Sequence, residues 1–169
     1  MENGLNIRSI TPSDFEACQQ IADDQLGKDY LQLADWEYSS RSKLGVVAIE
    51  NNAVCGFLLW KPSNEVTDFE TEIVYDFYLK NIAVSSEFQG KGIGDALVKA
   101  FIASVSGILT SRVWTYPGYT GLKRTLERND FEIIETVEQP WKDICDNGTF
   151  KCPVRKESCC CDAIIMRRL

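Results

Sequence analysis

The sequence predicts an α/β fold, with strands and helices mixed in one domain, and three observations predict it. Strand-like segments rich in β-branched and aromatic residues alternate with segments whose apolar residues recur at helical spacing. One strand-like segment runs directly into the glycine-rich stretch 89–95, after which a helical pattern begins. The chain has 169 residues, 44% of them hydrophobic, so we expect residues 1–169 to form a single domain with its own core.

The chain opens with one strand and one helix. Residues 5–10 alternate as a short strand, and a helix follows over residues 11–26, where Thr11 or Ser13 can cap its first turn. The apolar face expected for this helix consists of Ala17, Cys18, Ile21 and Ala22.

A hairpin and a longer strand come next. The dipeptide Asn51-Asn52 separates two strand-like segments, 44–50 and 53–60, and is typical of a tight hairpin turn. Residues 62–69 have the composition of a loop, and residues 71–84 predict one long strand that ends at the glycines.

The second half of the chain repeats the alternation. Apolar residues from Ile93 to about Val105 predict a helix with one buried face. The expected elements after it are a strand over 112–116, a helix over 120–130, and strands over 131–137 and 163–169. A cysteine-bearing insertion at about 140–162 separates the last two strands.

Composition excludes several classes of function. The formal net charge of −7 disfavours binding to nucleic acid through bulk positive charge, although Lys123, Arg124 and Arg128 could form a local basic patch. No basic leader and no long apolar run is visible, so we expect a cytoplasmic protein without a membrane partner. Histidine is absent, which excludes Ser-His-Asp triads and removes the commonest general base.

The stretch from Gly90 to Gly94 has the properties of an anion site. Glycines at 90, 92 and 94 let a phosphate approach main-chain amides at the positive end of a helix. An ordinary tight turn is the alternative. A P-loop is excluded because Gly94 is followed by Asp95, and the dinucleotide fingerprint is disfavoured because its last two glycines should stand three residues apart.

The pattern Q-x-x-G-x-G, formed by Gln89, Gly92 and Gly94 directly after "IAV", resembles the coenzyme A signature of the GNAT superfamily of N-acetyltransferases. The resemblance covers most of the chain except the insertion. It implies a mostly antiparallel, splayed sheet of about six to seven strands flanked by helices. The cofactor-binding residues that it implies are Ile82, Ala83 and Val84 along the pantetheine arm, and Gln89, Gly90, Lys91, Gly92, Ile93, Gly94 and Asp95 around the pyrophosphate.

The resemblance also implies an activity. Acetyl-CoA would be the cosubstrate, and the acetyl group would pass to a primary amine of a small molecule or peptide by direct attack through a tetrahedral intermediate. The protein would act as a monomer or homodimer. The alternative is a coenzyme A-binding regulatory or interaction module without turnover.

The catalytic acid and base do not follow from the signature. Tyr78 stands where a glutamate is common in the family, and by two-residue alternation Asp76, Tyr78 and Lys80 share a face with Ile82 and Val84. The tyrosine common on the next helix is replaced by Leu126, and the usual glycine before Phe131 is Asp130. The catalytic candidates are Tyr78, Asp76 and Tyr119, with Tyr116 beside Tyr119 at the end of a strand.

Five of the seven cysteines lie in the insertion: Cys145, Cys152, Cys159, Cys160 and Cys161. Four of them, all except Cys160, have spacings that permit a tetrahedral zinc site, although paired CxxC knuckles are missing. Packing or surface thiols, disulfides, and a reactive thiol near Lys151, Arg155 and Lys156 are the alternatives.

Overall fold

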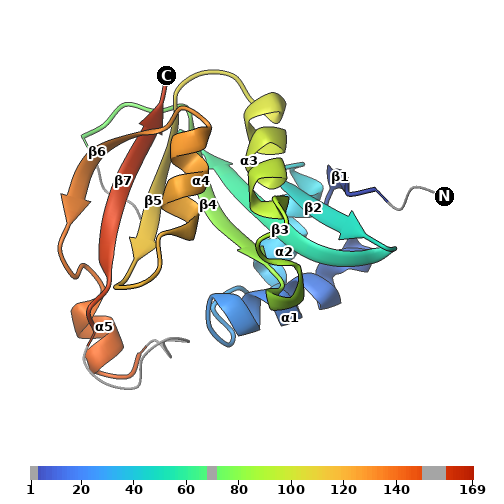
Figure 1. Ribbon diagram of the computed structural model, residues 1–169, viewed down its shortest axis with the longest axis horizontal. Coiled ribbons are helices and arrows are strands. Elements are labelled where there is room, and N and C mark those ends of the chain that lie inside the picture. Colours follow the sequence, from blue (N-terminus) through green and yellow to red (C-terminus); the bar gives the residue numbers. More distant parts are fainter. Residues whose placement is uncertain (1–3, 68–71, 150–158) are drawn as a thin grey trace.

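The computed structural model describes residues 4–67, 72–149 and 159–169 and builds them around one seven-stranded sheet. Figure 1 shows the arrangement. The strands are β1 (Asn6–Ser9), β2 (Gly45–Glu50), β3 (Ala53–Pro62), β4 (Phe77–Val84), β5 (Leu109–Thr115), β6 (Glu132–Val137) and β7 (Asp162–Arg168). The α-helices are α1 (Phe15–Gln25), α2 (Leu33–Arg41), α3 (Ile93–Ser104), α4 (Gly121–Arg128) and α5 (Lys142–Asp146).

The sheet has the order β1-β2-β3-β4-β5-β7-β6. Only β4 and β5 pair in parallel, and the other neighbours are antiparallel. The sequence prediction of a mostly antiparallel α/β sheet of six to seven strands is therefore confirmed. The hairpin between β2 and β3 is also confirmed, because Asn51 and Asn52 both adopt positive φ, at 53° and 62°.

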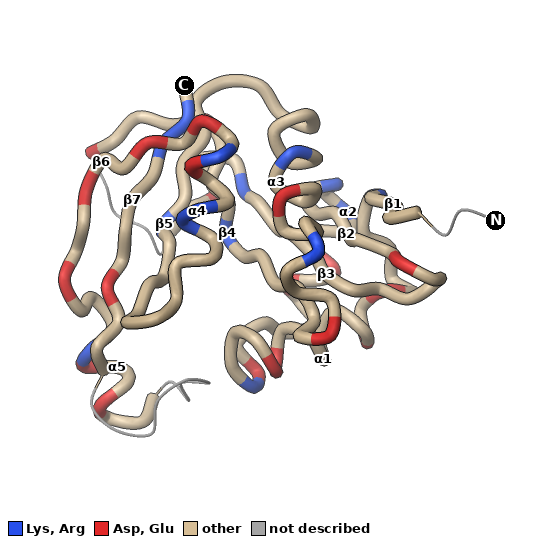
Figure 2. The backbone as a smooth tube through the Cα atoms, viewed as in Figure 1, with Lys and Arg blue, Asp and Glu red and all other residues tan. Residues whose placement is uncertain are grey.

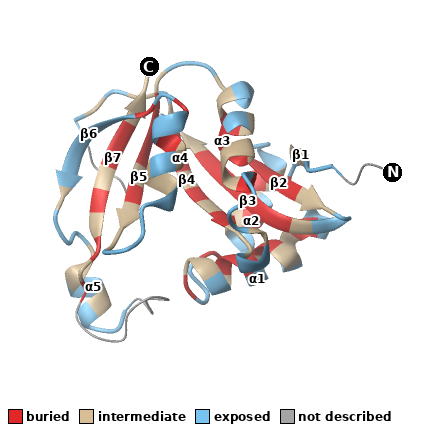
Figure 3. Cartoon of the chain, in the orientation of Figure 1, coloured by how far each residue is buried: buried red, intermediate tan, exposed pale blue. Residues whose placement is uncertain are grey.

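Helices cover the two faces of the sheet. Buried residues of α3 and α4 pack on one face with apolar side chains of β2, β3, β4 and β5. Buried residues of α1 and α2 pack on the other face with side chains of β2 and β3 and with Ala83 of β4. Figure 3 shows the buried residues concentrated on the central strands and on the helix sides that face them. This layering fixes which side chains of β4 look toward which helices.

Two strand boundaries and one helix differ clearly from the sequence prediction. The long strand expected over 71–84 begins only at Phe77, because the amides of Asp76 and Phe77 both donate to the carbonyl of Ile108, at 2.7 and 3.2 Å, at the point where β5 begins. Strand β5 starts earlier than expected, at Leu109. Helix α2 was not predicted. Its start is marked by the amide of Gln32, which donates to the Asp35 carboxylate at 2.9 Å.

Short 3-10 turns lie at Pro12–Asp14, Ser63–Glu65 and Ser86–Phe88, and the last of these leads from β4 into the glycine loop. No helix within the described ranges has both the length and the apolar character needed to cross a bilayer.

Candidate active site

The parallel pair β4 and β5 stays together over a short distance and then separates. Phe77–Leu79 pairs with Leu109–Ser111, and the Ser111 hydroxyl donates to the Leu79 carbonyl at 3.3 Å. Beyond this point β4 continues to Val84 beside β3 alone. Figure 1 shows β4 and β5 diverging toward their carboxyl ends. Among the described strands, none covers this edge of β4, so its main-chain groups are open to a ligand that adds as a strand.

A register shift within β4 reverses the direction in which its main-chain amides point. The amide of Phe77 donates toward β5, to the carbonyl of Ile108, whereas the amide of Ser85 donates to a carbonyl of β3 at 2.8 Å. These two residues are an even number of positions apart, so in a regular strand both amides would point to the same side. The reversal is explained by one extra residue in β4 between Leu79 and Asn81, where the pairing with β3 shifts.

The shift decides which main-chain groups of β4 point into the splay, which is the gap between β4 and β5 beyond their last paired residues, Leu79 and Ser111. Because the amide of Ser85 points to β3, the main-chain groups of Val84 and Ile82 point to the open side and those of Ala83 to β3. The carbonyl of Val84 accepts a hydrogen bond from the Gln89 side chain at 3.0 Å, which agrees with this direction. Two of the three residues in the IAV segment thus offer main-chain groups to the splay.

The same shift corrects a prediction about side chains. The expectation that Tyr78 and Lys80 share a face with Ile82 and Val84 is wrong. Ile82 and Val84 pack in the cluster under α3, whereas the Nζ atom of Lys80 lies 3.5 Å from the carboxylate of Asp35 on α2, across the sheet. Simple alternation fails because the extra residue inverts the faces downstream of it.

The glycine loop between β4 and α3 leaves open space and unpaired amides. Gly90 and Gly92 have positive φ, 76° and 80°, and a Cβ built on Gly90, Gly92 or Gly94 would meet no atom within 4 Å. In the described part of the chain, no backbone carbonyl accepts a hydrogen bond from an amide between Gly90 and Asp95. These amides lie at the amino end of α3, a 12-residue helix whose dipole favours an anion there.

Side chains of the loop are positioned by neighbours. The Nε2 atom of Gln89 donates to Oε1 of Gln25 at 2.9 Å as well as to Val84, so it ties the loop to α1 and β4. The ammonium of Lys91 lies 4.8 Å from the centre of the Phe88 ring. Figure 2 shows basic and acidic positions close together around the start of α3. In this conformation the Gln89 side chain holds the loop in place through its two hydrogen bonds. Lys91 is the basic residue within the signature 89–95.

Asp95 stands in the first turn of α3 and is held by two partners. Its carboxylate lies 2.8 Å from the Lys99 ammonium and accepts a 2.8 Å hydrogen bond from Asn129 after α4. The hydrogen bonds from Lys99 and Asn129 lower the pKa of this carboxyl, and burial opposes them only in part. Asp95 therefore stays ionised and joins the start of α3 to the end of α4.

Comparison with known proteins identifies this architecture. A family model described as an acetyltransferase (GNAT) domain matches residues 41–133, which is more than half of the chain. The chain belongs to the GNAT acetyltransferase family. The matched range contains β4, the glycine loop and α3, as the Q-x-x-G-x-G signature predicted. No curated protein sequence matches the chain significantly.

Solved structures of other GNAT-like proteins share the fold. Ard1 from Thermoplasma volcanium is 20% identical, with a TM-score of 0.69 over 97% of this chain and 96% of that one. NAA60 from Arabidopsis thaliana, solved with a bisubstrate analogue, is 16% identical with a TM-score of 0.71 over 97% of both chains. The ribosomal-protein-alanine N-acetyltransferase of Brucella melitensis is 18% identical, with a TM-score of 0.68 over 97% and 99%. At these identities the likeness concerns the fold.

Within this GNAT fold, the carboxylate of Asp76 has a structural partner. Its Oδ2 atom accepts a 2.7 Å hydrogen bond from the amide of Ile108, and it lies so close to Gly107 that a Cβ on that residue would collide with the carboxylate. Asp76 thus fastens the loop that enters β5, before the paired segment. The splay begins on the far side of that segment, so the geometry disfavours Asp76 as a base.

Tyr78 lies beside the splay, on the sheet face opposite α3. It is 6% exposed and packs with Ile165 of β7, while Tyr75 lies with its ring centre 6.4 Å away. Its cross-strand neighbour is Lys61, whose ammonium lies 5.5 Å from the centre of the Tyr38 ring in α2. Of the two catalytic candidates at 76 and 78, Tyr78 is therefore the one that lies on β4, close to the point where β4 and β5 separate.

Tyr119 lies after the carboxyl end of β5, on the side where β4 and β5 have separated. Its ring stacks on Tyr116 with 5.1 Å between ring centres, and Tyr116 in turn packs against Trp114. Tyr119 is 40% exposed, and its partial burial, together with the nearby Tyr116, raises its pKa above the ordinary 10.0. The phenol is protonated at neutral pH. Leu126, which stands at the usual tyrosine position, is buried in the core.

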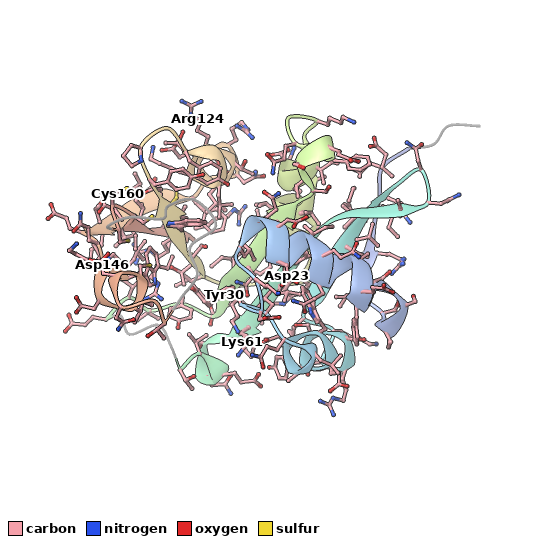
Figure 4. All side chains as sticks on the ribbon, turned by 90° about the horizontal axis from the view of Figure 1, so that it is seen from below. Asp23, Tyr30, Lys61, Arg124, Asp146 and Cys160 are labelled. Atoms are coloured by element: carbon pink, nitrogen blue, oxygen red, sulfur yellow. The ribbon has the colours of Figure 1, made fainter. Side chains whose placement is uncertain are left out.

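The insertion carries helix α5 and ends in three adjacent cysteines. Cys159 and Cys161 are buried and Cys160 is half-buried, and the amide of Cys159 donates to Asp146 at 2.9 Å. Figure 4 shows Asp146 and Cys160 on the same side of the molecule, away from Asp23 and Tyr30. In the described ranges, no group of three or more His, Cys, Asp or Glu is placed to hold a metal ion. Cys152 lies outside those ranges, as do Lys151, Arg155 and Lys156, and the zinc prediction has no support.

Two residues near the splay were not predicted from the sequence. Ser111 is buried and bonds the last paired carbonyl of β4. Asn81 is the residue before IAV and is buried, but its Oδ1 atom has no hydrogen-bond partner in the described part of the chain. The signal that could have pointed to Asn81 is a carboxamide inside a strand that otherwise consists of apolar and aromatic residues with one lysine.

Proposed function

We propose that this GNAT protein transfers an acetyl group from acetyl-CoA to a primary amine of a peptide or small molecule. One observation carries the proposal: an open strand edge on β4 is followed, after one short 3-10 turn, by the unpaired amides of Gly90–Asp95. A diphosphate fits these amides, because amides at a helix start bind anions. The pantetheine arm fits the open edge, because it can pair with the main chain of Ile82 and with the amide of Val84 as a strand would, while the Val84 carbonyl is held by Gln89.

The acceptor is proposed to approach from the face of α1 and α2. The glycine loop and the start of α3 lie toward the other face, so the coenzyme would occupy that side of the splay. Figure 4 shows Tyr30 and Lys61 on the α1 and α2 side. Similar structures include a NatC complex solved with a Gag peptide and CoA, and this supports peptide amino groups among the acceptors to be tested. The insertion between β6 and β7 is a second segment that could shape the choice of acceptor.

Two tyrosines are proposed for proton transfer. The amine nitrogen attacks the thioester carbon, the carbon–sulfur bond breaks, and the leaving thiolate takes a proton. Tyr119 suits this donation by position, because it follows the carboxyl end of β5, where β4 and β5 no longer pair, and a phenol is protonated at neutral pH. Tyr78, beside the splay, suits the orientation of a water that carries the proton from the amine. Asp76 is left with its structural role at Ile108.

A second candidate function is a coenzyme A-binding module without turnover. It is favoured by one observation: neither β4 nor β5 contains a carboxylate residue, so no such base stands on the strands that diverge. General acid–base catalysis is worth about 10²–10⁴-fold, so its absence would lower the rate sharply.

Thiol release separates the two candidates. The protein is incubated with acetyl-CoA and a panel of amines that contains alanine-ended peptides, a polyamine and an aminoglycoside, and free coenzyme A is measured. Release that depends on one of the amines, with the acetylated amine found by mass spectrometry, supports the transferase. Coenzyme A binding without amine-dependent release would instead establish the binding module.

A further inference from the structure

The buried carboxamide of Asn81 is the least satisfied polar group at the splay. Asn81 is 6% exposed, and its Oδ1 atom has no hydrogen-bond partner within the described ranges. A buried polar atom without a partner destabilises a folded protein unless a ligand or water satisfies it. In residues 4–67, 72–149 and 159–169, two other buried atoms of this kind occur, the Tyr38 hydroxyl and Trp60 Nε1, and they do not belong to the edge of β4. The unsatisfied Asn81 oxygen therefore lowers the stability of the free protein, at the place where the two substrates would meet.

The fold determines the direction of this side chain. Asn81 pairs across the strands with Leu59, and Ala83 pairs with Phe57. Leu59, Phe57 and Ala83 all belong to the cluster under α1 and α2. Directly opposite residues of an antiparallel pair project to the same face, so Asn81 projects toward α1 and α2. This is the face opposite α3 and opposite the glycine loop.

The position along β4 is equally specific. Leu79 is the last residue paired with β5, and Asn81 follows the extra residue Lys80, at the point where the strands begin to separate. The charge of Lys80 is engaged by Asp35 at 3.5 Å, which reduces its repulsion of an approaching ammonium group. The Asn81 carboxamide thus stands at the start of the splay with a neighbour whose positive charge is partly balanced.

We propose that the Asn81 carboxamide oxygen accepts a hydrogen bond from the attacking amine and holds its nitrogen at the thioester. This inference rests on the proposed transfer reaction and adds a residue that binds the acceptor. A carboxamide oxygen can accept an N–H hydrogen bond but does not take the proton, so Asn81 orients the amine and is not its base. The oxygen is covered in the free protein, so the carboxamide turns about its side-chain bonds to meet the amine, and no hydrogen bond of its oxygen opposes that turn.

The test uses coenzyme A derivatives and needs no knowledge of the natural acceptor. Alkylation of the coenzyme A thiol with N-methyl iodoacetamide gives a thioether, S–CH2–C(=O)–NH–CH3, whose amide N–H lies near the position of the attacking amine nitrogen, one bond further from the sulfur. The N,N-dimethyl derivative has the same shape near the sulfur but no N–H, and desulfo-coenzyme A lacks the whole group. Calorimetry measures the affinity of all three for the wild type and for Asn81→Leu, which keeps the approximate volume and removes the polar atoms.

The expected result is selective. Asn81→Leu should weaken binding of the N-methyl derivative about tenfold, the effect of one lost hydrogen bond, and should leave the affinities for the dimethyl derivative and desulfo-coenzyme A unchanged. The free variant should also melt at a temperature equal to or higher than the wild type, because an unsatisfied polar group has been removed. A purely structural asparagine would give the opposite shift in melting temperature.

Two outcomes overturn the inference. Equal weakening of all three ligands would place the partner of Asn81 on the pantetheine arm, and equal affinities throughout would mean that Asn81 meets no N–H. If the wild type fails to bind desulfo-coenzyme A, the proposed function itself fails, which is a distinguishable result. Should Asn81→Leu not fold because Leu59 crowds it, Asn81→Ala provides the same comparison with a smaller side chain.

Discussion

Substitution of Gly92 by alanine tests the glycine loop most sharply. Gly92 caps α3 with φ 80° and ψ 7°, a left-handed conformation, and a Cβ there would point into open space. In the free protein the added methyl group therefore meets no atom, and the cost arises from the backbone alone. Holding a non-glycine residue in this conformation costs about 1–2 kcal/mol. The lower entropy of the unfolded alanine chain offsets about 0.4–1 kcal/mol of it.

The effect on the ligand is expected to be larger than the effect on folding. The proposed diphosphate approaches the amides on the side that the glycines leave open, so a methyl group at Gly92 should displace it. Loss of one charge-assisted hydrogen bond is worth about 1.5–3 kcal/mol, or about 10–150-fold in affinity. The melting temperature should fall by only about 1–4 °C for a chain of this size.

Gly148 provides the matched control. It has φ 78° and open space around its Cβ position, but it lies after α5 and not at α3. Calorimetry with desulfo-coenzyme A and thermal melting are measured on Gly92→Ala, Gly148→Ala and the wild type. Both variants should lose similar stability, and only Gly92→Ala should lose affinity. Unchanged affinity in Gly92→Ala, or equal losses in both variants, would refute the placement of the diphosphate at this loop.

Three further predictions concern individual side chains. Tyr119→Phe should lower kcat about 10²-fold or more if Tyr119 is the general acid, and it should leave the affinity for desulfo-coenzyme A unchanged. Because the pKa of Tyr119 is raised, the wild-type rate should not decline through loss of this proton until the pH exceeds 10.0. Steady-state kinetics measured against pH check both points, and a variant that kept full kcat would contradict the role. Asp76→Ala should lower the free energy of unfolding by about 1 kcal/mol through the lost bond to Ile108, measured by urea titration, while a kcat that collapsed with intact folding would reinstate Asp76 as a base. Burial of Asp14 opposes its ionisation, but hydrogen bonds from Arg8 and Thr11 outweigh this effect and lower its pKa. The ionised Asp14 should therefore stabilise the fold above pH 3.8, and this stabilisation should be lost as the pH falls through the lower pKa of the folded state. In thermal melts recorded from pH 2 to 7, Asp14→Asn should lose less stability toward acid than the wild type, whereas an equal loss in both would show that Asp14 does not contribute.

Local patterns were sufficient for most of the fold. The hairpin at Asn51-Asn52, the helix that begins at Ile93 and the open loop before it follow from turn chemistry, helical spacing and glycine, and all three are found in the structure. Helix α2 was missed because only the Gln32 and Asp35 pair marks its start and its apolar stripe is weak. A short helix of this kind is stabilised mainly by what it packs against, and that is not visible in its own residues.

The candidate site was predictable where it consists of main chain and less so where it consists of side chains. The three glycines predict accessible main-chain amides, because glycine adopts positive φ readily and has no Cβ to keep a ligand away from the backbone. The register shift at Lys80 leaves no mark in the sequence, so the faces of Ile82 and Val84 were inverted in the prediction. Asp76 could not be separated from a catalytic carboxylate, because its partner Ile108 is distant in sequence and comes close only through the pairing of β4 with β5.

The central claim is that the amides at the start of α3 hold the diphosphate of coenzyme A. It is tested most directly by titrating the ¹⁵N-labelled wild-type protein with desulfo-coenzyme A and following the amide resonances by NMR. The largest shifts are expected for Gly90, Gly92 and Gly94, with smaller shifts for Ile82 and Val84 along the edge of β4. Saturable binding that left these resonances in place, or the absence of any binding at millimolar ligand, would contradict it.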